Sequence, residues 1–324
     1  MPGYLTKRVV QVHPLDLCNL RCAHCYSSSA PGLRASLPAA RLLALLERLR
    51  DEGYEAVSIS GGEPFLYREL EALVRGAKGA GYSVNLITNG TVLSNRRQQA
   101  LLTLLDLVAV SVDGAPDNHD RVRGPGAFAA AERGVDVIAA SGVPFGITFC
   151  VTTSSLEDVP WVRDFAEEKG ARLLSLRPLA PVGRATTMAS PEALTAADQA
   201  RLFLLAQLLD DDAGPRVRVD LTPAPQVLHG AREAFPVLDA RPETLRLSDW
   251  VNPLVIDERG RVLPFAYGVA ADYALGDLDA FDLGRLDSVR DLVTAALVEL
   301  ERSGSRFVDW FELVTATSHA AALA

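Results

Sequence analysis

The chain has 324 residues, of which 48% are hydrophobic and 23% charged, a balance typical of globular proteins that bury a core without disulfide bonds. Its net charge is −9 and no stretch gathers Lys and Arg into a long basic patch, which argues against binding to nucleic acid because phosphate contacts need clustered cations. No apolar run reaches the roughly 18 residues of a membrane span. The first residues also lack the apolar core of a signal peptide, so we expect a cytoplasmic protein without membrane contact.

Short β-rich segments alternate with amphipathic helical patterns through the first half of the chain. Strands are predicted at residues 8–13, 55–60, 83–88, 107–112, 144–151 and 172–177. Helices are predicted between them at 36–53, capped by Ser36, and at 67–80, 94–104, 127–140 and 156–169. Because parallel strands need helical crossovers, this order indicates an α/β fold with a partial (β/α)6 barrel. A doubly wound open sheet is the competing geometry, but the glycine-rich nucleotide-binding fingerprint is missing after the first strand.

The pattern changes after about residue 185. A helix is expected at 191–209, a strand at 217–221, a hairpin at 253–265 and a final helix at 287–302. We therefore predict two parts, a partial barrel over residues 1–185 and a smaller α+β cap over residues 186–324.

Three of the four cysteines, Cys18, Cys22 and Cys25, fall within eight residues directly after the first predicted strand. Thiolates are the natural ligands of iron–sulfur clusters, and three ligands leave one metal position open for catalysis. A zinc site with His24 or Cys150 as the fourth ligand is the alternative, and a buried, inert cysteine group is a weaker one. Cys150 itself, on the fifth predicted strand, is expected to pack in the core.

A second motif, Gly61-Gly62-Glu63-Pro64, directly follows the second predicted strand. Together with the loop DLCNLRCAHCY it resembles the radical S-adenosylmethionine (SAM) superfamily. The resemblance implies that Cys18, Cys22 and Cys25 hold a [4Fe-4S] cluster whose open iron chelates SAM. Reduction of the cluster then cleaves SAM to give a 5′-deoxyadenosyl radical. In that family the GGEP motif cradles the methionyl amino group, and the residue at His24 lies near the adenine.

Weaker family-like marks follow later strands, and each has a plain alternative as a capped turn or a surface ion pair. The resemblance implies SAM contacts by Asn89 in a TNG motif and by Ser111 and Asp113 in an S-x-DG motif. Arg123, in the family-like segment HDRVRG, could clamp a carboxylate, and Thr148 shares a strand face with Cys150 and could line the barrel. We therefore expect both to bind the cofactor. Arg177 is expected near the substrate mouth. The cysteine loop, GGEP, TNG, SVDG and the segment RPLAPVGR all mark the carboxyl ends of predicted strands, the face on which (β/α) barrels build their active sites.

The segment PLVIDERGRVLPF, followed by YALGDL, resembles the SPASM extension of some radical SAM enzymes, but it lacks that extension's cysteines and has Phe265 after Pro264. The resemblance therefore implies a cap without auxiliary clusters. We expect a small-molecule substrate in natural-product or cofactor biosynthesis, and an external flavodoxin- or ferredoxin-type electron donor. Maturation of a ribosomally made peptide is the alternative enzyme function, and a zinc-stabilised binding protein is the non-enzyme alternative. No catalytic acid or base can be assigned.

Overall fold

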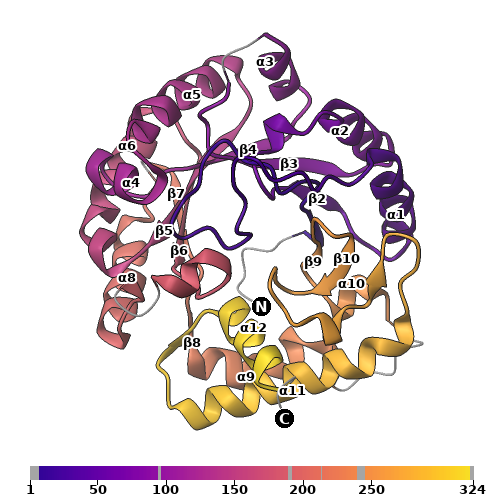
Figure 1. Cartoon of the computed structure of the whole chain (residues 1–324). Helices are drawn as coiled ribbons and strands as arrows, with labels where there is room; N and C mark the ends of the chain where they lie inside the picture. The colour runs from indigo at the N-terminus through magenta and orange to yellow at the C-terminus, as the bar shows by residue number, and fades with distance from the viewer. Residues whose placement is uncertain (1–6, 94–95, 189–191, 213, 239–244, 322–324) are drawn as a thin grey trace.

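A ten-stranded sheet, curved into a partial barrel and covered by helices on its outer face, organises the fold (Figure 1). The computed structural model describes residues 7–93, 96–188, 192–212, 214–238 and 245–321. The strand order is β11-β10-β9-β1-β2-β3-β4-β5-β6-β7. The eight neighbouring strands β9, β1, β2, β3, β4, β5, β6 and β7 run parallel to one another. Beyond β9, strand β10 pairs antiparallel with β9, and β11 pairs antiparallel with β10.

The strands of this sheet are β1 (Val9–Val12), β2 (Ala56–Ile59), β3 (Ser83–Thr88), β4 (Leu107–Ser111), β5 (Phe145–Val151), β6 (Leu173–Pro178), β7 (Arg216–Val219), β9 (Leu254–Ile256), β10 (Arg261–Pro264) and β11 (Gly276–Asp277). The α-helices are α1 (Ala39–Asp51), α2 (Leu70–Gly79), α3 (Arg96–Leu102), α4 (Pro116–Arg123), α5 (Ala127–Ser141), α6 (Val159–Glu168), α8 (Ala196–Leu209), α9 (Ala224–Ala234), α10 (Leu247–Trp250), α11 (Leu286–Ser303) and α12 (Trp310–Ala321).

Side chains alternate along the barrel strands between an apolar outer face and a more polar inner face. On β4, Val108 and Val110 are fully buried within the apolar core shared with the covering helices. Ser111 points to the opposite face and is only partly buried. The register places Ser111 beside Thr148 of β5, and Thr148 beside Ser175 of β6. The inner wall over β4–β6 is therefore a row of small hydroxyl side chains.

The six strands predicted in the first half are confirmed, each within one residue at either end. The first helix, in contrast, begins at Ala39 with Pro38 as its N-cap, so the cap predicted at Ser36 is wrong. Ser36 instead forms a β-bridge with Leu15, and Leu37 N–H donates to Pro14 O at 2.8 Å. Because Ser36 and Leu37 pair in extended conformation with residues 14–15, the helix begins only at Ala39.

Helices α4, α9, α10 and α12 are absent from the sequence predictions. In α4 only His119 and Val122 are buried, so the segment lacks the apolar stripe by which helices are found in a sequence. The helix predicted at 156–169 divides into a 3₁₀ turn, Thr153–Asp158, and α6. The first residues of the helix predicted at 94–104, and the first of that at 191–209, lie outside the described residues.

The segments after residue 185 extend the same sheet at both of its edges. Strand β7 pairs with β6, and the predicted hairpin, confirmed as β9 and β10, pairs through β9 with β1. A separate two-stranded sheet joins β8 (Thr222–Pro223) to β12 (Phe307–Val308). Helix α12 lies at the side where the sheet is open, between β8 and β10 (Figure 1). Four strands of the region expected to form the cap, β7, β9, β10 and β11, thus extend the barrel wall.

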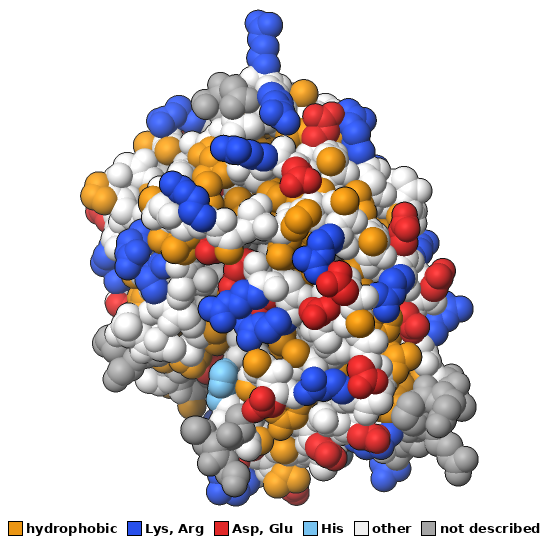
Figure 2. All heavy atoms as spheres, turned by 45° about the vertical axis from the view of Figure 1, so that its right-hand side comes forward, with side chains coloured by type: hydrophobic (Ala, Val, Ile, Leu, Met, Phe, Trp, Pro, Cys, Tyr) orange, Lys and Arg blue, Asp and Glu red, His pale blue; other side chains and the backbone are white. Residues whose placement is uncertain are grey.

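On the face shown in Figure 2, basic and acidic side chains are interspersed rather than gathered into patches of one sign. This agrees with the absence of a long basic run in the sequence. Among the described residues, none of the helices combines the length and the apolar character needed to cross a membrane.

Candidate active site

The loop that carries three cysteines follows β1 and packs against the end of β2. Gly62 N–H donates to Leu15 O at 2.9 Å, and Glu63 N–H donates to Leu17 O at 2.9 Å. A Cβ atom on Gly62 would lie 2.0 Å from Leu17 O, closer than any real contact allows. Only glycine at this position lets the two backbones meet. The GGEP glycines therefore hold the cysteine loop against the sheet.

The Glu63 carboxylate is fully buried and joins the ends of β2 and β3. It accepts hydrogen bonds from Phe65 N–H (3.1 Å), Thr88 Oγ1 (2.8 Å) and Asn89 N–H (2.9 Å). Burial raises its pKa to about 6, and the three donors limit the rise. Pro64 begins the short 3₁₀ turn that follows. The contacts of Glu63 fix the position of Asn89.

Asn89 in turn contacts the first cysteine. Its Nδ2 atom donates to Cys18 Sγ at 3.7 Å and to Asn19 Oδ1 at 3.0 Å, while its Oδ1 accepts from Thr91 N–H and from the Thr91 hydroxyl. Leu20 N–H also donates to Cys18 Sγ, at 3.4 Å. Cys18 is buried, and burial raises the pKa of its thiol to about 12. Two donors aimed at one sulfur suit a thiolate ligand.

His24, Asp113 and Arg123 form a compact network between the cysteine loop, the end of β4 and α4. His24 Nε2 lies 2.6 Å from Asp113 Oδ2, and Arg123 Nε donates to the same oxygen at 2.5 Å. Asp113 Oδ1 accepts from Cys150 N–H at 3.0 Å. Burial alone would raise the Asp113 pKa, but the Arg123 charge and His24 hold it well below its usual range. Asp113 is therefore an ionised hub.

The remaining predicted cofactor residues, Ser111 and Thr148, lie beside each other on the inner wall. Within the described part of the chain, neither side chain has a hydrogen-bonding partner, so both hydroxyls are available to a ligand in the barrel. Cys150, the next inward residue on β5, is not fully buried, and burial raises the pKa of its thiol.

Arg177 lies beside Cys150 in the sheet and forms an ion pair with Asp220, with 3.3 Å between Nε and Oδ2. Asp220 follows β7, and Asp309, just before α12, faces it closely enough for their charges to interact. Burial, with the negative charges of Asp220 and Glu312, raises the Asp309 pKa to about 8. From the sequence, Asp220 could face the substrate but is assigned no role, and Asp309 is not singled out, because no local motif joins residues so far apart in the chain.

The residues of the loop fit an iron–sulfur ligand set. Three thiols come from one loop, backbone and amide donors reach Cys18 Sγ, and Arg123 and Arg184 bring positive charge near Cys22. Burial still raises the pKa of Cys22, so its ionisation requires the compensating charge that a bound metal supplies. Among the described residues, no group of three His, Cys, Asp or Glu side chains is already arranged as the ligands of a metal ion.

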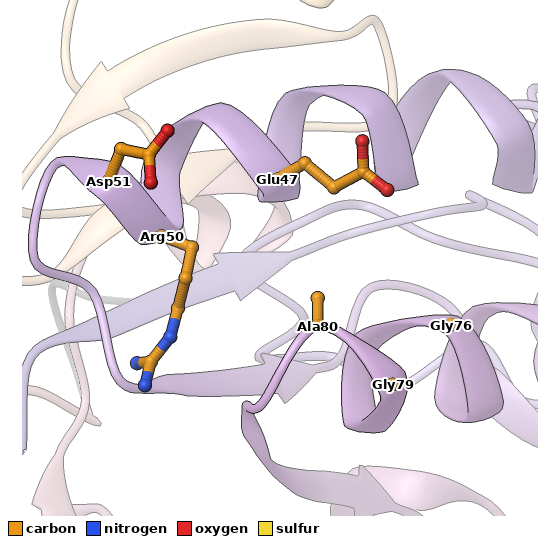
Figure 3. A pocket seen from close by; sticks show the side chains of 6 residues that line it. All are labelled: Glu47, Arg50, Asp51, Gly76, Gly79 and Ala80. Carbon is orange, nitrogen blue, oxygen red and sulfur yellow. The ribbon is translucent and has the colours of Figure 1, made fainter.

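A hollow on the outer surface lies apart from this site, between α1 and α2 (Figure 3). It is lined by Glu47, Arg50, Asp51, Gly76, Gly79 and Ala80. Its arginine is engaged within the fold, since Nη1 of Arg50 donates to Tyr54 O at 2.8 Å and the guanidinium lies over the Tyr82 ring. None of the predicted site residues lines this hollow.

The thiol-rich loop lies at the carboxyl ends of the strands, the face on which (β/α) barrels build active sites, and thiolates are the natural ligands of iron–sulfur clusters. Residues 12–166 match the family model described as the Radical SAM superfamily. This part of the chain is a Radical SAM domain, and the family implies SAM and an iron–sulfur cluster as cofactors.

Two relatives with established names are similar in sequence. Fe-coproporphyrin III synthase of Methanosarcina barkeri is 30% identical over 189 residues, 57% of this chain and 47% of that protein. Pre-heme d1 synthase of Dinoroseobacter shibae is 27% identical over 299 residues, 86% of this chain and 73% of that protein. The chain spans about half the length of the first relatives it matches.

The fold is also that of a solved structure. Streptococcus suis SuiB bound to S-adenosylmethionine superposes with a TM-score of 0.69 and 17% identity, covering 88% of this chain and 68% of that chain. At this level of identity the likeness shows the fold alone.

Proposed function

We propose that the chain reductively cleaves SAM at a [4Fe-4S] cluster held by Cys18, Cys22 and Cys25, and that the 5′-deoxyadenosyl radical so formed abstracts hydrogen from a small-molecule substrate. The observation that carries the proposal is the seating of the cysteine loop. The GGEP glycines hold its backbone against β2, and two donors point at Cys18 Sγ.

The residues proposed to serve SAM fall into two groups by their contacts. Ser111 and Thr148 present hydroxyl groups on the inner wall, and we assign them direct contact with SAM. We assign the same role to His24, which lies in the cysteine loop directly before Cys25 and whose ring is held at Nε2 by Asp113. Because their polar atoms are already used within the protein, Glu63, Asn89, Asp113 and Arg123 support that first group. Asp113 in particular fixes the orientation of the His24 ring.

A small-molecule substrate is supported by the names of the two relatives, a Fe-coproporphyrin III synthase and a pre-heme d1 synthase. Both names denote synthases of small biosynthetic molecules. The ion pair of Arg177 and Asp220, with Asp309 opposite, lies on the inner face and suits a polar substrate. A one-electron donor of the flavodoxin or ferredoxin type completes the proposal.

The test is anaerobic reconstitution with iron and sulfide, followed by SAM and dithionite, with 5′-deoxyadenosine measured by chromatography. Wild type is compared with a Cys18/Cys22/Cys25→Ala triple variant and with Cys150→Ala, a cysteine variant outside the loop. We expect wild type and Cys150→Ala to bind about four iron atoms per chain and to form 5′-deoxyadenosine. The triple variant should do neither. A colourless wild-type protein that retains zinc and leaves SAM intact would refute the proposal.

A further inference from the structure

Arg184 binds the backbone of the cysteine loop at four points. Its Nε donates to Cys22 O at 3.0 Å, Nη1 to Ser28 O at 2.6 Å and Nη2 to Ser29 O at 2.6 Å. Its own backbone N–H donates to Cys25 O at 3.0 Å. A single side chain and its backbone N–H, in the segment after β6, therefore bind carbonyl groups that lie before and after the last cysteine.

The residue before it is equally constrained. Gly183 has φ +62°, and a Cβ atom there would lie 2.1 Å from Tyr26 O and 2.7 Å from Cys25 O. Glycine at this position lets the 183–184 backbone approach the loop closely enough for Arg184 to reach it.

The loop needs this support because part of it is in an unfavourable conformation. Ser28 has φ +54°, in the left-handed region that non-glycine residues rarely adopt. The carbonyl of Ser28 accepts from Nη1 of Arg184, and that of Ser29 accepts from Nη2. A planar guanidinium with several fixed donors can hold such a turn, whereas a lysine ammonium acts as a single point charge.

Resting on the proposed function, we propose that Arg184 is a positioning residue for the iron–sulfur cluster. Its guanidinium fixes the arrangement of Cys22 and Cys25 before the cluster binds. Its positive charge stabilises the reduced cluster, which carries one more negative charge than the oxidised one. Arg184 thus contributes both geometry, through three carbonyls, and charge.

Two substitutions separate these contributions. Arg184→Lys keeps the positive charge but loses the planar guanidinium group that donates to three carbonyls. Arg184→Ala loses both the charge and these donors. Arg50→Lys is the matched control, because Arg50 also donates to a backbone carbonyl, that of Tyr54, at the amino end of the strands. Reconstituted proteins are compared by the rate of iron loss to a ferrous chelator, by EPR-monitored redox titration and by thermal unfolding.

We expect both Arg184 variants to lose iron at least about tenfold faster than wild type, because hydrogen bonds from a charged donor are worth that factor or more. The midpoint potential should become more negative in Arg184→Ala and stay near the wild-type value in Arg184→Lys. Arg50→Lys should match wild type in iron loss and in potential.

Iron loss and potential unchanged in both Arg184 variants would overturn the inference. A uniform drop in thermal stability, with unchanged potential in Arg184→Ala, would also overturn it, because Arg184 would then be a purely structural residue. A wild-type protein that binds no [4Fe-4S] cluster would refute the proposed function instead, so the two failures are distinguishable.

Discussion

His24 Nε2 and Asp113 Oδ2 are 2.6 Å apart, although 89 residues separate them in the chain. Because His24 precedes the last cysteine of the loop and Asp113 follows β4, the contact ties the loop to the middle of the barrel. Arg123 shares the same carboxylate oxygen, and its side chain is only 9% exposed. The three groups form a buried network whose members depend on one another.

Asp113→Asn should lower the free energy of unfolding by about 3–5 kcal/mol, because it leaves the buried Arg123 charge without its partner. Urea unfolding at pH 7 under anaerobic conditions measures this. Asp117→Asn, on the exposed side of α4, is the control and should change stability by less than about 0.5 kcal/mol. Equal effects of the two substitutions would show that the buried network contributes no more to stability than an exposed carboxylate does.

Gly62→Ala should displace the cysteine loop, because the added methyl group would meet Leu17 O at 2.0 Å. We expect a loss of stability of about 1–3 kcal/mol and a lower iron content after reconstitution. Gly79→Ala is the control, since nothing lies within 4 Å of its Cβ position, and it should stabilise α2 by up to about 1 kcal/mol. Normal iron content in Gly62→Ala would contradict the role given to the second glycine.

Asp309 should make the protein less stable as pH rises. Its folded-state pKa is raised from 3.8 to about 8, so the folded protein holds a proton that the unfolded chain releases. The stability linked to this proton is complete below pH 4 and is lost as pH rises towards 8. Asp309→Asn, which keeps an acceptor for Phe311 N–H and Glu312 N–H, should remove this dependence.

Thermal midpoints measured from pH 5 to pH 9 test this prediction. Relative to wild type, Asp309→Asn should gain a few degrees at pH 9, where the buried Asp309 carboxyl is ionised, and less at pH 5. Glu301→Gln, an exposed acid on α11, should leave the pH profile unchanged. Parallel profiles for wild type and Asp309→Asn would show that Asp309 is ionised across this range.

The sequence predicts the barrel strands well because their apolar residues alternate with a clear period. It also predicts the cysteine loop and GGEP, which are continuous motifs. The requirement for glycine at position 62, where a side chain would clash with the Leu17 carbonyl, could not be predicted. It depends on where two backbone segments cross in the folded protein. The contacts of Arg184 with backbone carbonyls could not be predicted for a related reason. Every residue has a carbonyl group, so the residue types of the loop do not indicate which carbonyls accept these hydrogen bonds.

Long-range pairing explains the other gaps. Asp220 and Asp309 are 89 residues apart in the chain, and only the folded structure brings their charges close enough to interact. The strand β7 was expected, but its place next to β6 depends on register that a short apolar run does not encode. Phe265, where the resemblance leads one to expect cysteine, is buried with φ +65° after β10.

The pairing of β1 with β9 has a consequence for how the protein is made. Strand β1 lies between β2 and β9, so one of its edges stays unpaired until residues 254–256 have left the ribosome. A nascent chain that has completed β6 still presents open edges on β1 and β6, which invite association with other chains. The cysteine loop is anchored at β1 as well, so maturation with iron and sulfide is expected to follow release of the full chain.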